Sequence, residues 1–304
     1  MKIIKLIALV TVICVSLGCQ NNQSSNTTQS SENSMMKDTN TAIPKISVQL
    51  WSVKNELKAD FKGTLTKISN MGFEGVEFAG DFGPYKDDAH GLKRFLDSVG
   101  LQVSAAHIKF PAFTDENFKA FSDFYKTIGT DTLIIAWDDR AWDAAQFDSL
   151  ITDFNTMYSK LKAAGFRFGF HNHDQEFNAY KGSTFWDQIA QSTPNDFILQ
   201  MDAGWVTYAG KDPVTYINRY AGRTLTTHIK AKIPKALRAE AASKGKRPII
   251  GDDITDWAAV LKADIAVGGT KWFVVEQEEY PDGLTPLQAV ELSKKGLDKI
   301  ISNL

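Results

Sequence analysis

Short segments of alternating apolar and polar residues recur along positions 44–304, and a stretch with helical spacing follows each one. The clearest strand pattern is 166–170, where a phenylalanine stands at every second position before the sequence changes to HNHDQE at 171–176. A buried strand therefore ends in imidazoles and carboxylates, which need partners or a metal ion when they are buried. The alternative for this segment alone is a polar loop whose histidines bond the backbone.

Seven other segments have a strand pattern: 46–51, 73–79, 101–107, 132–137, 197–202, 224–231 and 271–277. The helical spacing covers 59–71, 86–99, 115–128, 143–164, 183–191, 213–220, 256–262 and 285–304. Eight strand–helix pairs over about 260 residues predict an α/β fold, a closed (β/α)8 TIM barrel spanning 44–304. The alternative is an open doubly wound sheet, but positions 52–55 after the first strand contain no glycine for a phosphate loop.

Six polar residues fall at or near the carboxyl ends of these predicted strands. They are Glu77, His107, His171, Asp202, His228 and Glu276. In a closed parallel barrel these ends meet on one face, where barrel enzymes place their chemistry. The sequence therefore predicts an active site on that face.

Composition narrows the class of partner. The 304 residues carry a net charge of -2 and 43% hydrophobic residues, which is ordinary for a globular protein. A near-neutral chain offers no cationic field for a phosphate backbone, so the sequence predicts no nucleic-acid partner.

The amino terminus has the layout of a targeting signal. Lys2 and Lys5 precede an apolar run at 6–15, and Gly18 precedes Cys19. The segment resembles a bacterial lipoprotein signal at 1–18, which implies a lipid on Cys19 and a periplasm-facing anchor in the cell envelope. Residues 19–43 are mostly Asn, Gln, Ser and Thr and predict a flexible tether. We expect membrane contact only through the lipid, and the sequence indicates no particular oligomeric state.

Seven short motifs in order resemble the xylose-isomerase-like TIM-barrel superfamily, which includes sugar isomerases and epimerases, inosose dehydratase and type IV apurinic endonucleases. The motifs are QLWS at 49–52, GFEGVEFAG at 72–80, HNHDQEF at 171–177, MDAGW at 201–205, HIK at 228–230, GDDITDW at 251–257 and VVEQ at 274–277. The resemblance implies one divalent metal ion held by His171, Asp202, His228 and Glu276. Two imidazoles and two carboxylates without a thiolate suit Mn, Co, Fe or Zn.

One position departs from the superfamily pattern. The fifth strand of the ketose epimerases ends in a glutamate that binds the metal and moves a proton, whereas this chain has His171. Glu276 is then the one matched carboxylate base, and a second base must come from another strand-end residue. The candidates are His107, His173, Glu176 and Glu77. Lys230 points to the same side of its strand as His228, and it either stabilises an oxyanion or pairs with Asp202 or Glu276.

The resemblance implies a divalent-metal-dependent isomerase or epimerase that abstracts a proton alpha to a carbonyl of a non-phosphorylated sugar. The alternatives are a metal-dependent lyase that eliminates the aglycone from 3-keto-glycosides and a non-catalytic sugar-binding barrel. Phosphodiester cleavage at abasic DNA needs a three-metal cluster with more ligands than this chain offers. Trp51, Trp137 and Trp205 either pack the barrel or stack on a sugar ring.

Overall fold

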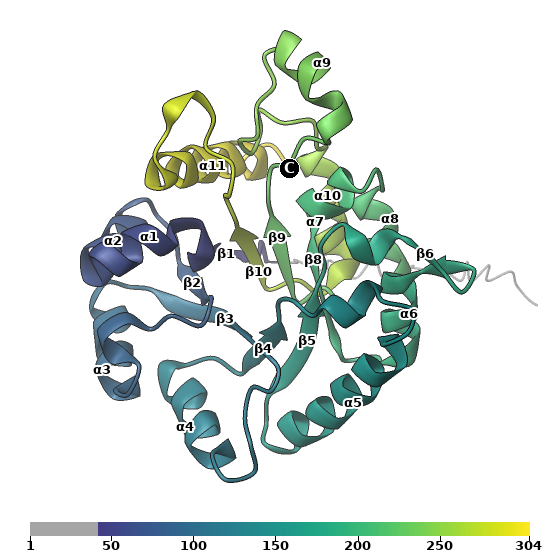
Figure 1. Cartoon of the computed structure of the whole chain (residues 1–304). Helices are drawn as coiled ribbons and strands as arrows, with labels where there is room; N and C mark the ends of the chain where they lie inside the picture. Colours follow the sequence, from purple (N-terminus) through teal and green to yellow (C-terminus); the bar gives the residue numbers. More distant parts are fainter. Residues whose placement is uncertain (1–41) are drawn as a thin grey trace, which may run out of the picture. The chain divides into compact units, whose positions relative to one another are not determined.

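Eight buried strands close into a parallel barrel in the computed structural model of the chain, which describes residues 42–304 (Figure 1). The barrel strands are β1 Lys45–Gln49, β2 Gly75–Phe78, β3 Gln102–Ile108, β4 Thr132–Ile135, β5 Arg167–His171, β8 Ile198–Asp202, β9 Thr226–Ile229 and β10 Trp272–Val275. Their order around the barrel is β1-β10-β9-β8-β5-β4-β3-β2. The predicted (β/α)8 barrel is confirmed, and the alternative of an open sheet is wrong.

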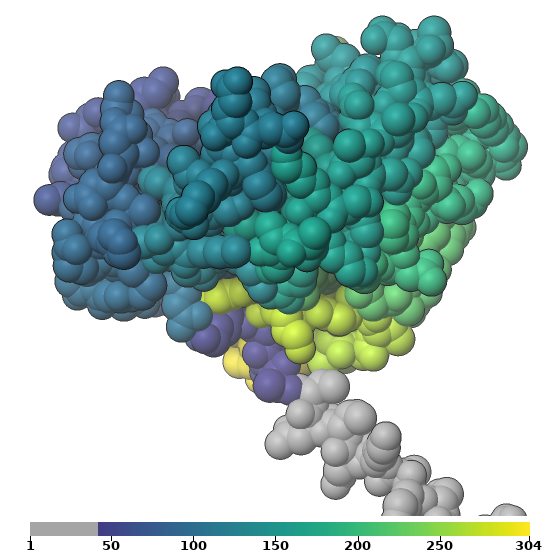
Figure 2. Space-filling view, turned by 90° about the horizontal axis from the view of Figure 1, so that it is seen from below, coloured from purple at the N-terminus to yellow at the C-terminus, as the bar shows by residue number. Residues whose placement is uncertain are grey.

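Helices form a ring around the strands (Figure 1). They are α1 Lys54–Ala59, α2 Phe61–Asn70, α3 Ala89–Ser98, α4 Phe118–Ile128, α5 Phe147–Ala163, α6 Phe185–Ser192, α7 Ala203–Tyr208, α8 Pro213–Arg219, α9 Arg238–Ser243, α10 Trp257–Ala263 and α11 Pro286–Ile301. Side-chain caps fix where several begin: Thr184 and Thr285 each form a capping box at the start of α6 and α11. On the side shown in Figure 2, segment 80–130, which carries α3 and α4, lies next to segment 140–190, which carries α5.

The apolar core lies between the strands and the helices. Phe154 of α5 packs against Phe168, Phe170 and Phe197, with ring centroids 5.1–6.3 Å apart. Each of these rings is at most 1% exposed, and burying one contributes about 1.5–3 kcal/mol. The alternate strand residues point into the barrel, and Gln49, Glu77, Gln200 and His228 are buried polar side chains among them. Apolar packing therefore holds the strands to the helices, while the barrel interior contains buried polar side chains.

Several elements were not predicted by the periodicity. They are α1, α7, α9 and the short hairpin of β6 Ala179–Tyr180 and β7 Ser183–Thr184. The expected helix at 183–191 is wrong at its start, because residues 183–184 belong to the hairpin. The expected helix at 143–164 also begins late, at Phe147, because Asp143 forms a turn by accepting a hydrogen bond from the Ala145 amide.

The predicted signal at 1–18, Cys19 and nearly all of the predicted tether at 19–43 lie outside the described residues. Within 42–304, the helices are all too short or too polar to span a bilayer.

Candidate active site

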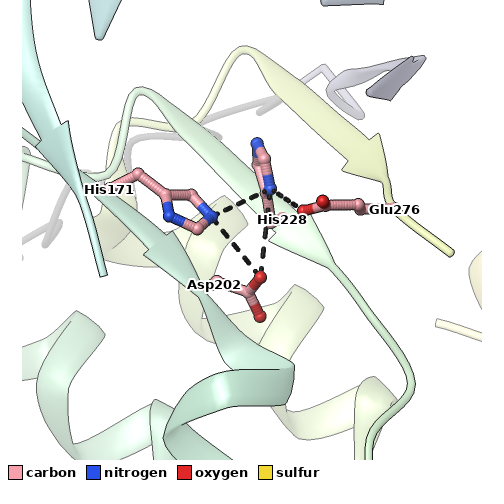
Figure 3. Close-up of side chains that lie close together, drawn as sticks. All are labelled: His171, Asp202, His228 and Glu276. Carbon is pink, nitrogen blue, oxygen red and sulfur yellow. Dashed lines mark hydrogen bonds and ion pairs between the residues drawn. The ribbon is translucent and has the colours of Figure 1, made fainter. Parts of the chain in front are cut away.

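The predicted ligands meet at one end of the barrel (Figure 3). His171 is the last residue of β5 and Asp202 the last of β8, while His228 lies in β9 and Glu276 directly follows β10. All four are at most 5% exposed. One ligand atom from each lies within 4.8 Å of the ligand atoms of the other three.

The spacing of these atoms fits a single ion. His171 Nε2 lies 3.2 Å from His228 Nδ1 and 3.4 Å from Asp202 Oδ2, and His228 Nδ1 lies 2.8 Å from Glu276 Oε2. Two atoms each about 2.1 Å from one ion in tetrahedral geometry are about 3.4 Å apart. Asp202 Oδ2 is buried without a hydrogen-bond partner among residues 42–304. The donor set therefore fits a divalent ion of the Zn, Mn, Co or Fe type.

The electrostatics of the ligands agree with this interpretation. Burial, followed by the neighbouring cations, lowers the pKa of His171 well below its usual range, so its imidazole is neutral and able to ligate. Burial opposes ionisation of Glu276, but Lys230 and His228 lower its pKa well below the usual range. For His228, burial is outweighed by Glu77 and Glu276, which raise its pKa to about 10. Without a metal ion, His228 is therefore protonated and its positive charge lies between the carboxylates of Glu77 and Glu276. Binding of a metal ion to His228 Nδ1 must release a proton from the ring.

Glu77 holds His228 from the side opposite the ligands. Its Oε1 lies 2.7 Å from His228 Nε2 and accepts a hydrogen bond from Gln49 at 2.6 Å, while its Oε2 accepts one from Gln200 at 2.7 Å. Burial opposes ionisation of Glu77, but His107 and His228 lower its pKa well below the usual range. Glu77 therefore fixes the ring orientation in which His228 Nδ1 faces the other ligands.

His107 belongs to the same buried network. Its Nε2 lies 2.7 Å from Gln200 Oε1 and 2.9 Å from Glu77 Oε1, and its Nδ1 lies 3.2 Å from Gln49 Nε2. Glu77, His107 and His228 are close enough to share an ion. The amides of Gln49 and Gln200 already occupy the carboxylate oxygens of Glu77, so we interpret this group as a hydrogen-bond network.

The two other candidate bases differ in access. His173 lines the cleft, and its ring lies 4.6 Å from Trp137 and 5.5 Å from Trp205. Burial, followed by His171 and Lys230, lowers its pKa to about 2, so the imidazole is neutral. Glu176 is fully buried and accepts a hydrogen bond from the His173 amide at 2.8 Å. Glu176 thus positions the His173 backbone.

Lys230 is 2% exposed and surrounded by carboxylates. Its Nζ lies 2.5 Å from Glu278, 3.3 Å from Glu276 and 3.7 Å from Asp202. Burial lowers its pKa, but these three carboxylates outweigh that effect and raise the pKa above its usual range. Lys230 is therefore a permanent cation beside the ligands. It makes the ion pairs with Asp202 and Glu276 that the sequence offered as one alternative for its role.

A cleft of about 780 Å³ opens above the ligands. Trp51, Trp137 and Trp205 all line it, and the first two are 44% and 50% exposed. Trp51 donates a hydrogen bond from Nε1 to Glu278, and Trp137 donates one to Asp139. These contacts fix two indoles at the cleft, in positions where a sugar ring could stack.

Several residues of the site were missed from the sequence. Gln49 and Gln200 are polar residues within otherwise apolar strand segments. That position was the one signal that could have indicated that their side chains point into the barrel. Asn172 accepts a hydrogen bond from the Asp202 amide at 2.9 Å and so ties β5 to β8. Glu278 follows the matched VVEQ motif by one position and had no signal of its own.

Comparison with known proteins agrees with the geometry. Residues 65–301 match the model of the xylose isomerase-like TIM barrel. The chain belongs to that family. Members named as dehydratases or isomerases place it in an enzyme superfamily.

Three known proteins illustrate what this chain is similar to. Inosose dehydratase of Lacticaseibacillus casei is 23% identical over 273 residues, covering 78% of this chain and 89% of that protein. A crystal structure of a sugar phosphate isomerase/epimerase from Parabacteroides distasonis ATCC 8503 has a TM-score of 0.67 and 25% identity, covering 84% of this chain and 98% of that chain. The structure of the IOLI protein with a bound zinc atom has a TM-score of 0.60 and 16% identity, covering 85% and 98%. The last comparison shows the shared fold.

Proposed function

We propose that the protein is a divalent-metal-dependent enzyme that removes a proton from the carbon next to a carbonyl group of a non-phosphorylated sugar. The observation that carries the proposal is the set His171, Asp202, His228 and Glu276, gathered at ion spacing under an accessible cleft. A divalent ion held there supplies Lewis-acid polarisation of the carbonyl, which makes the neighbouring carbon acidic.

Two groups that line the cleft can exchange a proton with the substrate, His173 and Glu276. The ring of His173 is neutral and lines the cleft, so the imidazole can accept a proton. His107 also lines the cleft, but both of its nitrogens face the amides of Gln49 and Gln200. Glu77 and Glu176 are fully buried and act through His228 and His173. We therefore assign proton transfer to His173 and Glu276.

Lys230 stabilises the negative charge that develops on the carbonyl oxygen. Its ammonium lies beside the ligands and lines the cleft, and the carboxylates around it keep it charged. A buried fixed cation stabilises a developing oxyanion more strongly than a solvated one.

The cleft favours a sugar without a phosphate group. Among residues 42–304, the lysines that line it are Lys109 and Lys230, and no arginine of this range does. Lys230 is already ion-paired with three carboxylates, and phosphate sites usually present an arginine fork or several cations.

Isomerisation or epimerisation follows when the abstracted proton returns to carbon. Elimination is the second candidate, and the similarity to inosose dehydratases favours it. In that outcome the electron pair of the broken C–H bond forms a carbon–carbon double bond, and the leaving oxygen departs with a proton. A single carboxylate base at the ligands, Glu276, is compatible with either outcome when His173 is the partner.

Incubation of the metal-loaded protein with keto-sugars and 3-keto-glycosides in deuterated water tests the proposal. Deuterium in a rearranged sugar indicates isomerisation, and release of an aglycone with an unsaturated sugar indicates elimination. Absence of both products and of any exchange would overturn proton abstraction and leave a sugar-binding barrel.

We also propose that a lipid on Cys19 holds the protein in the cell envelope. The charges on Lys2 and Lys5, the apolar run and Gly18 support this proposal. Cys19→Ala should move the protein from the membrane fraction to the soluble fraction or block its processing. If the variant stays in the membrane fraction at the mature mass, the anchor lies elsewhere; Cys14→Ala is the matched control.

A further inference from the structure

The cleft has two unlike halves. The polar half contains the ligands His171 and Glu276 together with His173, Lys230 and Glu278. The other half, which we call the apolar lobe, is lined mainly by Ala79, Phe82, Ile108, Pro111, Ala112 and Phe121, and His107 and Lys109 of the same strand end stand beside it. Sugar hydroxyls need hydrogen-bond partners, and none of these six side chains offers one.

The barrel order separates the two halves. The lobe residues follow β2, end or follow β3, or lie in α4. The polar half is built at the ends of β5, β8, β9 and β10, and β1 and β4 stand between the two sets. Trp51 follows β1 and Trp137 follows β4, so the two exposed indoles lie at the junctions. A ligand with its sugar at the metal ligands must therefore extend across the barrel mouth to reach the lobe.

The lobe is held in place and remains accessible. Phe82 packs 4.8 Å from Phe78 and 4.7 Å from Phe124, while Phe121 packs 4.8 Å from Tyr125. Phe82 and Phe121 are nevertheless only half-buried. Rigid aromatic surface that stays open beside a polar site is typical of ligand pockets.

Tyr125 adds one polar group to the wall of the apolar lobe. Its side chain lines the cleft and is 7% exposed, yet its hydroxyl makes no hydrogen bond within residues 42–304. Burial raises its pKa to about 12, so the hydroxyl stays a neutral donor. The hydroxyl is not one of the fully buried unpaired polar atoms, so it is open to solvent and can donate a hydrogen bond to a ligand at the wall of the apolar lobe.

We infer that the apolar lobe binds the aglycone of a glycoside whose sugar lies at the metal ligands. This inference rests on the proposed function and assigns its substrate class: a sugar carrying an apolar, ring-sized aglycone with an oxygen within reach of Tyr125. The volume of about 780 Å³ is in the range of sites for drug-sized ligands and exceeds what one pyranose ring needs.

Binding of two unreactive probes tests the inference apart from turnover. Phenyl and methyl β-D-glucopyranoside carry the same sugar and no carbonyl, so their affinities for the metal-loaded protein can be measured by titration calorimetry. Burial of the phenyl ring should make the phenyl glucoside bind roughly tenfold tighter or more. Equal affinities, or no saturable binding of the phenyl glucoside at millimolar concentration, would overturn the inference.

Two substitutions at one small residue localise the effect. Ala112→Phe should fill the lobe and Ala112→Asp should place a charge in it, and each should reduce the phenyl preference to about the methyl level. Affinity for the methyl glucoside should not change. Ala239→Phe, at an exposed position in α9, is the matched control and should keep the preference.

A phenyl preference that survives both Ala112 variants would place the aglycone elsewhere and overturn the inference. The preference for the phenyl glucoside is a difference in binding affinity and requires no catalytic turnover. It can therefore hold even if the deuterium experiment finds no proton abstraction. Conversely, exchange into free keto-sugars without any phenyl preference would support the proposed function and overturn the aglycone site.

Discussion

Single residues in this site serve two partners at once. Asp202 accepts a hydrogen bond from the Trp205 amide with Oδ1 at 2.9 Å, and its Oδ2 lies 3.4 Å from His171 Nε2. The two ring nitrogens of His228 likewise contact different partners: Nε2 contacts Glu77 and Nδ1 contacts Glu276. One side of each group is fixed by the fold, so the other side is already aimed before an ion binds, which lowers the entropic cost of binding.

His228→Ala should strongly reduce bound metal while leaving the barrel folded. The variant removes the one ligand that contacts both Glu77 and Glu276, and metal analysis together with circular dichroism measures the outcome. His90→Ala, at an exposed position of α3, is the control. Full metal occupancy in His228→Ala would place the ion elsewhere.

Glu77→Gln should weaken metal binding roughly tenfold to a hundredfold although Glu77 is not a ligand. The neutral amide keeps the size of the side chain but loses the charge that orients His228 through Nε2. Competition with a chromophoric chelator measures the affinity, which a purely structural role for Glu77 would leave unchanged. Glu74→Gln, an exposed neighbour, should bind metal like the wild type.

At the scale of elements, α7 ties the ligand strands together. It begins directly after Asp202, and Gly204 in its first turn lies against the end of β9. A Cβ on Gly204 would lie 1.9 Å from the Lys230 carbonyl oxygen, which is backbone and cannot move aside. The close approach of α7 to β9 therefore requires glycine at this position.

Gly204→Ala should lower the unfolding midpoint and the metal affinity together, because it pushes α7 and Asp202 away from β9. We expect a loss of about 2 kcal/mol or more in the free energy of unfolding. Gly91→Ala in α3 is the matched control, since the atoms nearest to its Cβ belong to the side chain of Asp88, which can turn aside, and not to backbone. Equal effects of the two substitutions would contradict the proposed contact.

The strands were predictable because each one has apolar residues at alternate positions between polar segments, and the ligands followed because they stand at strand ends. The short elements were not. The six residues of α7 are too few for a helical period, and its cap, Asp202, also has to serve as a ligand. The exchange of hydrogen bonds among Gln49, Glu77 and Gln200 depends on which strands are neighbours, and periodicity does not contain that information.

At the scale of the whole molecule, stability depends on polar groups buried away from the site. Asp264 begins the π-helical turn Asp264–Gly268 after α10 and is fully buried. Its Oδ1 accepts a hydrogen bond from Thr270 at 3.2 Å, while its Oδ2 has no partner in the described barrel. Burial raises its pKa to about 7 from 3.8, and the hydrogen bond offsets only part of that effect.

This shift sets a pH dependence with a definite sign. The folded protein keeps the Asp264 proton up to about pH 7, whereas the unfolded chain releases it near pH 3.8, so the folded state binds more protons between these values. The free energy of unfolding therefore falls as pH rises from about 4 to 7, by roughly 3–4 kcal/mol from this group, and levels off above pH 7.

Asp264→Asn mimics the neutral acid and should remove that fall, so the stability of the variant relative to the wild type should be higher at pH 8 than at pH 4.5. Any constant cost of the amide cancels in this comparison of urea unfolding curves. Asp87→Asn, at an exposed position, should show no such difference, and an Asp264→Asn effect of equal size at both pH values would contradict the buried neutral acid.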